Sequence, residues 1–243
     1  MRTILAALAL ATPLVSYASA IPDVHTSTLN LTSISDYSNS TALTVLSDQG
    51  GATKVTTAAW RTMRNIETDG GFANYDNYQM SMTFAPAAGY VITGYSISAY
   101  ASGILKPAVR PPEANGSWKP GVAENRSSIY LSDGRSGLTF KEFDDITTPT
   151  LLEFGVQGLS IDRATDFHFE TAISANAGFG NWWDNPDGWN PTEHRVGSYA
   201  QIAFKDPTLT IYTALAPVPE PETWAMLLAG IALVGVAKRR NKR

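Results

Sequence analysis

The chain has 243 residues, of which 44% are hydrophobic and 16% charged, and its formal net charge is −4. This composition excludes a fibrous or intrinsically disordered chain and is typical of a globular protein. The sequence contains no cysteine, which excludes disulfides, thiolate metal sites and a cysteine nucleophile.

The charges are distributed unevenly along the chain. Arg2 and the last six residues hold six of the 18 Lys and Arg, so residues 21–237 carry 12 basic against 22 acidic side chains, a net charge of −10. Such a surface repels phosphate groups, so we expect no nucleic-acid partner. It remains compatible with cations and neutral sugars.

The first 20 residues have the pattern of a secretory signal peptide. Arg2 supplies a positive charge, residues 4–15 form an apolar stretch, and Ala18 and Ala20 fit the small-x-small rule for cleavage before Ile21. We therefore expect signal peptidase to remove this segment and the rest of the chain to be exported. The alternative is an uncleaved membrane anchor.

Residues 21–216 are expected to form the exported body, in which apolar and polar residues alternate with a period of two. This alternation indicates strands with one buried and one wet face, and two such sheets bury their apolar sides on each other. The pattern predicts an all-β fold, an antiparallel β-sandwich or jelly roll of about nine strands. The expected strands are 43–46, 78–84, 90–100, 129–131, 138–140, 152–156, 167–173, 200–204 and 209–213, with turn signals at 48–51, 69–71, 133–134 and 206–207.

Two stretches depart from this pattern. Residues 26–57 are rich in Thr and Ser and weakly patterned, which is compatible with disorder near the mature N-terminus. Trp60, Met63 and Ile66 recur every three residues, and this spacing predicts a short helix.

The most distinctive stretch of the body is 178–191, which is too rich in Gly, Asn and Pro to be expected as a strand. Sugar rings stack on indole faces while Asp and Asn bind hydroxyls, so this loop has the composition of a glycan site. A second loop, 107–121, adds a further tryptophan. The favoured interpretation is that these aromatic side chains close one end of the sandwich. The candidate glycan-binding residues are Trp118, Trp182, Trp183, Asp184, Asp187 and Trp189.

Two groups of polar side chains are candidate metal ligands. The aspartates and asparagines of 184–190 suit calcium, but their spacing does not fit the EF-hand pattern. Asp166, His168 and Glu170 fall on one face of an expected strand, and a solvated sheet face explains them without a metal. We therefore expect no resident metal or cofactor, with calcium at 184–190 as the alternative.

Catalytic motifs of the common hydrolases, and the phosphate- and dinucleotide-binding motifs, are absent from the sequence. The three histidines are too scattered to suggest a triad, and Glu142, Asp144 and Asp145 are interpreted as surface charges in a loop. We therefore expect a protein without enzymatic activity. A polysaccharide-acting hydrolase is an alternative, because glycosidases are defined by the distance between two carboxylates and not by a local motif.

The last 27 residues, 217–243, differ from the body. Residues 224–237 hold no charge, and a helix of that length spans about 21 Å, short of the ~30 Å hydrocarbon core. The basic end, 238–243, is expected to stay cytoplasmic, which places the body outside. The tail therefore predicts a C-terminal transmembrane helix that is a transient or retained inner-membrane anchor, preceded by an extended, proline-rich peptide that a processing enzyme can reach.

A short motif precedes the apolar run. It consists of Val218, Pro219, Glu220, Pro221 and Glu222, followed by Trp224. With the apolar run and the basic end, this motif resembles the PEP-CTERM sorting signal of Gram-negative bacteria, a tail that also carries the name ice-binding protein C-terminal domain. The resemblance implies recognition by an exosortase, a membrane cysteine protease, with removal of the tail and release or transfer to the surface. It also implies a host that makes extracellular polysaccharide.

We therefore expect an exported structural or adhesive component of the cell surface or of a biofilm's exopolysaccharide matrix. Its expected partners are signal peptidase, an exosortase and extracellular polysaccharide. Exposed tryptophan faces in a groove would instead favour a carbohydrate-binding module that uses 178–191. Two carboxylates facing each other across a cleft at roughly 5–10 Å would favour a glycosidase.

Overall fold

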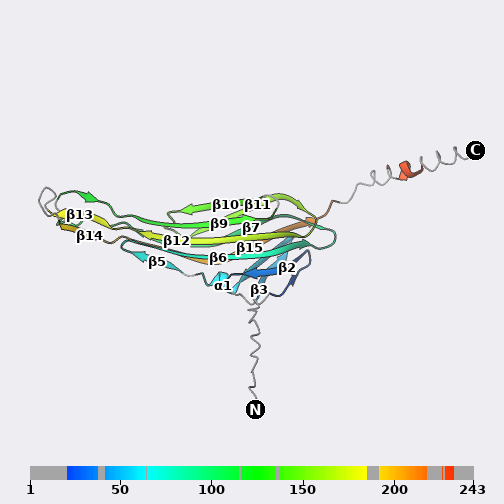
Figure 1. Cartoon of the computed structure of the whole chain (residues 1–243). Coiled ribbons are helices and arrows are strands. Elements are labelled where there is room, and N and C mark those ends of the chain that lie inside the picture. Colours follow the sequence, from blue (N-terminus) through cyan, green and yellow to red (C-terminus); the bar gives the residue numbers. More distant parts are fainter. Residues whose placement is uncertain are drawn as a thin grey trace, which may run out of the picture.

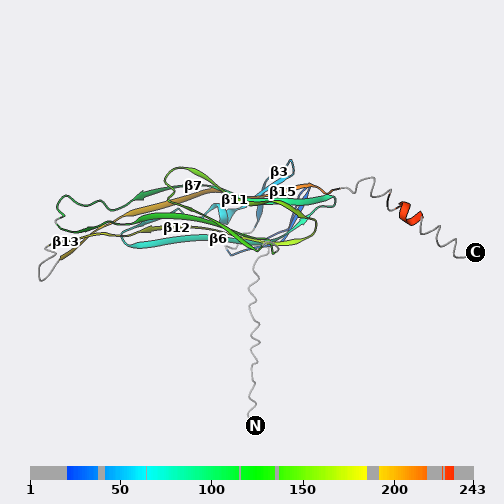
Figure 2. The ribbon, with the colours of Figure 1, turned by 90° about the horizontal axis from the view of Figure 1, so that it is seen from above.

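A computed structural model describes residues 21–37, 42–63, 65–114, 116–134, 137–184, 192–217, 226 and 228–232. The described strands form two antiparallel sheets that lie as two layers of an elongated body, and a third, smaller sheet extends one end (Figures 1 and 2). The architecture confirms the prediction of an all-β, antiparallel sandwich.

Each of the three sheets has its own lateral order of strands. The first sheet has the order β1 (Val24–His25), β2 (Leu29–Asp36), β6 (Phe72–Pro86), β12 (Thr165–Ala177), β9 (Ala123–Ser132) and β10 (Leu138–Asp144). The second sheet has the order β11 (Thr150–Ile161), β7 (Tyr90–Lys106), β15 (Tyr199–Leu215), β4 (Ala52–Thr57) and β3 (Leu43–Gln49), with β5 (Ile66–Asp69) also paired to β15. The end sheet has the order β14 (Thr192–Val196), β13 (Gly180–Asp184) and β8 (Trp118–Lys119).

The inner faces of the first and second sheets meet in a core rich in aromatic rings. Phe169 is fully buried, and its ring centroid lies 4.8 Å from that of Trp60 and 6.0 Å from that of Tyr78. Phe84 stacks on Phe167 with centroids 4.4 Å apart. Each such ring contributes roughly 1.5–3 kcal/mol through burial, so this core holds the two layers together.

A short helix, α1 (Ala58–Arg61), follows β4 and places Trp60 in the core. Thr57 caps the helix, because its hydroxyl accepts a hydrogen bond from the Trp60 amide at 3.0 Å. The helix is shorter than the one predicted from the spacing of apolar residues, because Ile66 is not helical. Ile66 begins β5 and pairs with Ile202 of β15. The period of three therefore reflects burial of successive apolar residues by a helix and then by a strand.

The described residues contain 15 strands, more than the sequence indicated. The weakly patterned stretch 26–57 holds β2, β3 and β4, so the expectation of disorder is wrong for the described part of this stretch. Threonine is favoured in strands, and the hydroxyl groups of threonines in this stretch form hydrogen bonds inside the fold. Thr56 donates to the Pro207 carbonyl at 2.8 Å, and Thr57 donates to Tyr78 Oη at 2.9 Å.

The two strands expected on either side of residue 206 are one strand, β15. Its register with β7 shifts between Lys205 and Thr208, and Asp206 has a φ of 52°. This irregularity accommodates Pro207, which has no N–H to donate to the ladder. The expected turn is therefore a bulge within a continuous strand.

Both ends of the chain lie largely outside the described residues. The expected signal segment, 1–20, and the tail residues 218–225 fall outside them, and residues 226 and 228–232 of the apolar run are helical. Within the described part of the chain, no helix is long and apolar enough to cross a membrane.

Candidate functional site

The end sheet contains the described part of the tryptophan-rich stretch. Gly180–Asp184 form β13, which corrects the expectation of a loop, because pairing with β8 and β14 brings large rings together across the sheet. Trp182 lies opposite Trp118, and its ring stacks on His194 with centroids 4.1 Å and planes 13° apart. Because Trp182 is only 7% exposed, this arrangement supports packing over sugar stacking for its indole.

The other candidates of this stretch are divided between the end sheet and undescribed residues. Asp184 Oδ2 lies 2.6 Å from His194 Nε2, a partner that no sequence signal indicated. Trp183 is half-buried in β13. Asp187 and Trp189 lie outside the described residues, as do the other expected calcium ligands after Asp184.

The histidine and two carboxylates expected on one strand face do share the outer face of β12. Each forms a hydrogen bond with a side chain of β6. The pairs are Asp166 with Thr83 (2.8 Å), His168 with Ser81 (2.9 Å) and Glu170 with Asn77 (3.2 Å). Across the described residues, no group of three or more His, Asp or Glu side chains is placed to hold a metal ion.

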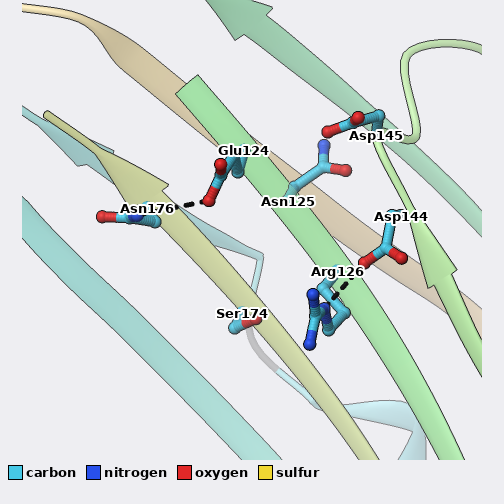
Figure 3. A pocket seen from close by; sticks show the side chains of 7 residues that line it. All are labelled: Glu124, Asn125, Arg126, Asp144, Asp145, Ser174 and Asn176. Carbon is cyan, nitrogen blue, oxygen red and sulfur yellow. Dashed lines mark hydrogen bonds and ion pairs between the residues drawn. The ribbon is translucent and has the colours of Figure 1, made fainter. Parts of the chain in front are cut away.

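A groove on the outer face of the first sheet is the strongest candidate site. It consists of two adjoining hollows of about 370 and 350 Å³, which share Arg126 and Ser174. The lining of the first hollow (Figure 3) includes Glu124, Arg126, Asp144, Asp145, Ser174 and Asn176. The lining of the second includes Tyr75, Ser128, Tyr130, Glu142, Glu170 and Ala172. The two hollows together are called the sheet groove below.

Strand register explains why the sheet is hollowed here. Ser174 of β12 lies opposite Arg126 of β9, and in the next outward-facing row Ala172 lies opposite Ser128. Outward-facing residues on adjacent strands are only about 5 Å apart, so short side chains leave a recess between longer ones. Ala172, Ser174 and Ser128 therefore form the floor of the sheet groove.

Arg126 lies where the two hollows meet and is held by two carboxylates of β10. Its Nε donates to Asp144 Oδ1 at 2.7 Å (Figure 3), and its Nη1 donates to Glu142 Oε1 at 3.3 Å. The hydrogen bond to Asp144 is the main cause of the raised pKa of Arg126, and the charges of Asp144 and Glu142 add to it. The guanidinium is thus a planar set of donors with a defined orientation.

Aromatic rings border the second hollow. Tyr75 is 57% exposed, and its hydroxyl donates to Glu170 Oε1 at 3.4 Å. Partial burial, followed by the negative charge of Glu170, raises the pKa of Tyr75. Tyr130 stacks on Phe140 with centroids 5.7 Å and planes 21° apart. The sheet groove therefore has aromatic rings beside polar groups.

The charge of the sheet groove is predominantly negative. Among the described residues, five carboxylates line it, against the single guanidinium of Arg126. They are Glu124, Glu142, Asp144, Asp145 and Glu170. This excess of formal negative charge disfavours an anionic ligand and permits a neutral one.

The sequence did not indicate the sheet groove. Glu142 and Asp144 lie in β10, which corrects their expected place in a loop. Arg126 and Ser174 come from strands that are distant in the chain and adjacent in the sheet. No local pattern marks such a site, because its floor consists of small residues that alternate like those of any half-buried strand.

Comparison with known proteins identifies the tail. Residues 217–243 match the family model of the PEP-CTERM protein-sorting motif. The chain therefore carries this sorting signal, as the resemblance indicated, and the signal implies export, processing by an exosortase and association with the cell surface.

No curated protein matches the chain. Among solved structures, TmCBM61 in complex with β-1,4-galactotriose has a TM-score of 0.26 at 11% identity and covers 72% of this chain and 88% of its own. A CBM4 structure has a TM-score of 0.20 at 12% identity and covers 69% of this chain and 87% of its own.

Proposed function

We propose that the body is a non-enzymatic, adhesive component of the cell surface or of the extracellular polysaccharide matrix. The observation that carries this proposal is the sheet groove, a polar recess on the outer face of a sheet. Its donors and acceptors are already oriented by contacts such as that between Arg126 and Asp144. Groups oriented in advance lose little conformational entropy when a polymer binds.

The tail supplies delivery to the place where such a polymer is found. The PEP-CTERM motif supports export and exosortase processing. In the proposed sequence of events, signal peptidase removes residues 1–20, and the tail holds the chain at the inner membrane until the exosortase acts. The body then passes to the surface or the matrix.

Binding fits the sheet groove better than hydrolysis does. Arg126 occupies the space beside Glu142 and Asp144, and Glu170 accepts a hydrogen bond from Asn77. These carboxylates are engaged with protein donors. A glycosidase needs two carboxyl groups that face the scissile bond from opposite sides, so the contacts support an adhesive role.

Two measurements on the natively exported protein test this proposal. The first is the intact mass of the protein from the envelope and from the medium, and we expect a species that starts near Ile21 and lacks residues 224–243. The second is co-sedimentation of that species with exopolysaccharide extracted from the host, where we expect retention. Retention of residues 224–243 in the membrane would contradict the sorting part, and failure to co-sediment would contradict the adhesive part.

A further inference from the structure

We propose that the sheet groove binds an internal segment of a neutral, hydroxyl-rich polysaccharide. This inference rests on the proposed adhesive function and adds to it the ligand class and the ligand's charge. The groove extends along β12 from Asn176 to Glu170, which is about 20 Å at ~3.3 Å per residue. Two hollows in line, joined at Arg126 and Ser174, suit several consecutive sugar rings better than one small molecule.

The aromatic rings of the second hollow provide surfaces on which sugar rings stack. Tyr75 of β6 is 57% exposed, and Tyr130 of β9 is backed by Phe140. The hydroxyl of Tyr75 is positioned by Glu170 at 3.4 Å, which restrains the ring. A restrained, exposed ring offers apolar contact area at a low entropic cost.

The polar groups of the groove match the alternating donors and acceptors of sugar hydroxyls. Arg126 has five N–H donors, and its contacts with Asp144 and Glu142 engage Nε and Nη1. In the first hollow, Asn176 Nδ2 donates to Glu124 Oε2 at 3.4 Å, which orients an amide and a carboxylate side by side. Such planar groups accept and donate to neighbouring hydroxyls without rearrangement.

Charge selects among polysaccharides. Uronate or sulfate groups would meet five carboxylates and one guanidinium in the groove, so an anionic chain is repelled. A neutral chain meets no such penalty. A basic peptide would also be attracted by the carboxylates. Its ammonium groups cannot accept from the N–H donors of Arg126 at the junction of the two hollows, however, whereas a sugar hydroxyl can.

The experiment measures binding of the natively exported protein by isothermal titration calorimetry and affinity electrophoresis. The neutral probes are laminarin, galactan and mannan, the anionic probes are alginate and polygalacturonate, and the cationic probe is oligolysine. We expect binding to at least one neutral probe and none to the anionic probes. The groove variants are Tyr75→Ala, Arg126→Gln and Ser174→Trp, where the last fills the floor while removing no aromatic ring or charge. Each is expected to raise Kd at least tenfold.

Matched controls separate the groove from general surface effects. Tyr100→Ala removes a tyrosine that is 54% exposed on the second sheet, and Arg163→Gln removes an exposed arginine outside the groove. Both are expected to leave Kd unchanged. Trp183→Ala tests the end sheet as a competing site. Far-ultraviolet circular dichroism and urea unfolding of each variant show that a change in Kd is not due to loss of the fold.

Each result bears on the inference in a stated way. Loss of neutral-glycan binding in all three groove variants, with both controls unchanged, supports it. Preference for an anionic probe or for oligolysine overturns it, as does loss of binding in Trp183→Ala alone. If no neutral probe binds while host exopolysaccharide still co-sediments, the assignment of a neutral ligand to the groove fails and the adhesive function stands. If neither the neutral probes nor the host exopolysaccharide binds, the ligand assignment and the adhesive function both fail.

Discussion

Asp48 of β3 connects the two layers of the sandwich through hydrogen bonds to its carboxylate. Ser27, between β1 and β2, donates from its backbone amide at 2.9 Å and from its hydroxyl at 2.8 Å, and Thr53 donates at 2.8 Å. The backbone hydrogen bond from Ser27 is the main cause of the lowered pKa of Asp48. The contact therefore depends on the ionised carboxylate.

Because of this contact, the free energy of unfolding depends on pH in the acid range. Because the folded-state pKa of Asp48 lies below its unfolded value near 3.8, its stabilisation is present above that pH and is lost as the pH falls through the folded value. We expect Asp48→Asn to lower the free energy of unfolding by about 1–2 kcal/mol at pH 7, and the difference from the native chain to shrink by pH 3. Urea unfolding at both pH values measures this. Asp162→Asn, an exposed control, should change little, and an equal deficit at pH 7 and pH 3 would contradict the role of the charge.

At the scale of secondary-structure elements, the buried side chain of Asn125 joins three segments of the chain. These are β9, β15 and the connection from β10 to β11. Asn125 Nδ2 donates to the carbonyls of Ile146 at 2.7 Å and Gln201 at 2.9 Å, and Asn125 Oδ1 accepts from the Ile146 amide at 2.7 Å. Gly103 makes room for this amide, since a Cβ there would collide with it. Asn125 thus joins strands of both sheets at the edge of the sheet groove.

Replacing that amide by an acid of the same shape tests the connection. In Asn125→Asp the side chain loses the donors to both carbonyls and places a carboxylate against them. We expect a loss of about 2–4 kcal/mol in the free energy of unfolding, since buried polar groups without partners are costly. Thermal and urea unfolding measure this. Asn30→Asp, beside His25 at the surface, is the matched control and should cost less than about 0.5 kcal/mol; similar losses at both positions would show that Asn125 has no special role.

For the molecule as a whole, the aromatic core and the proposed binding surface lie on opposite faces of the first sheet. The inner face carries the aromatic core, and the outer face carries the sheet groove. Phe169 belongs to the core at 0% exposure, whereas Phe140 backs Tyr130 at 58% exposure. Substitutions of the same type should therefore have different consequences on the two faces.

The pair Phe169→Ala and Phe140→Ala tests that separation. Phe169→Ala opens a cavity between Trp60 and Tyr78 and should cost about 3–5 kcal/mol of unfolding free energy. Phe140→Ala should change stability by less than about 0.5 kcal/mol, while weakening binding of the neutral glycan probe. Urea unfolding and calorimetric titration of the two variants provide both values. Comparable losses of stability in the two variants would contradict the assignment of faces.

The strands and the sorting tail could be predicted from the sequence because both depend on neighbouring residues. The alternation at 78–84 and 167–173 predicted the inner faces of β6 and β12, and the motif at 218–224 predicted the sorting signal. Such signals need no knowledge of distant contacts, since a strand's pleat and a linear peptide recognised by an enzyme are local. Local reading was less accurate at 58–66, where pairing of Ile66 with Ile202 ends the helical segment.

The arrangement of strands and the sheet groove were decided by pairing between residues distant in the chain. Arg126 meets Asp144 and Ser174 only because β9 lies between β10 and β12. Trp182 likewise became a packed ring, and not an exposed platform, because β14 brought His194 against it. The sequence alone shows which residues alternate and which sorting signal the chain carries. Which alternating residues become neighbours depends on the lateral order of the strands, and that order follows from packing the whole core.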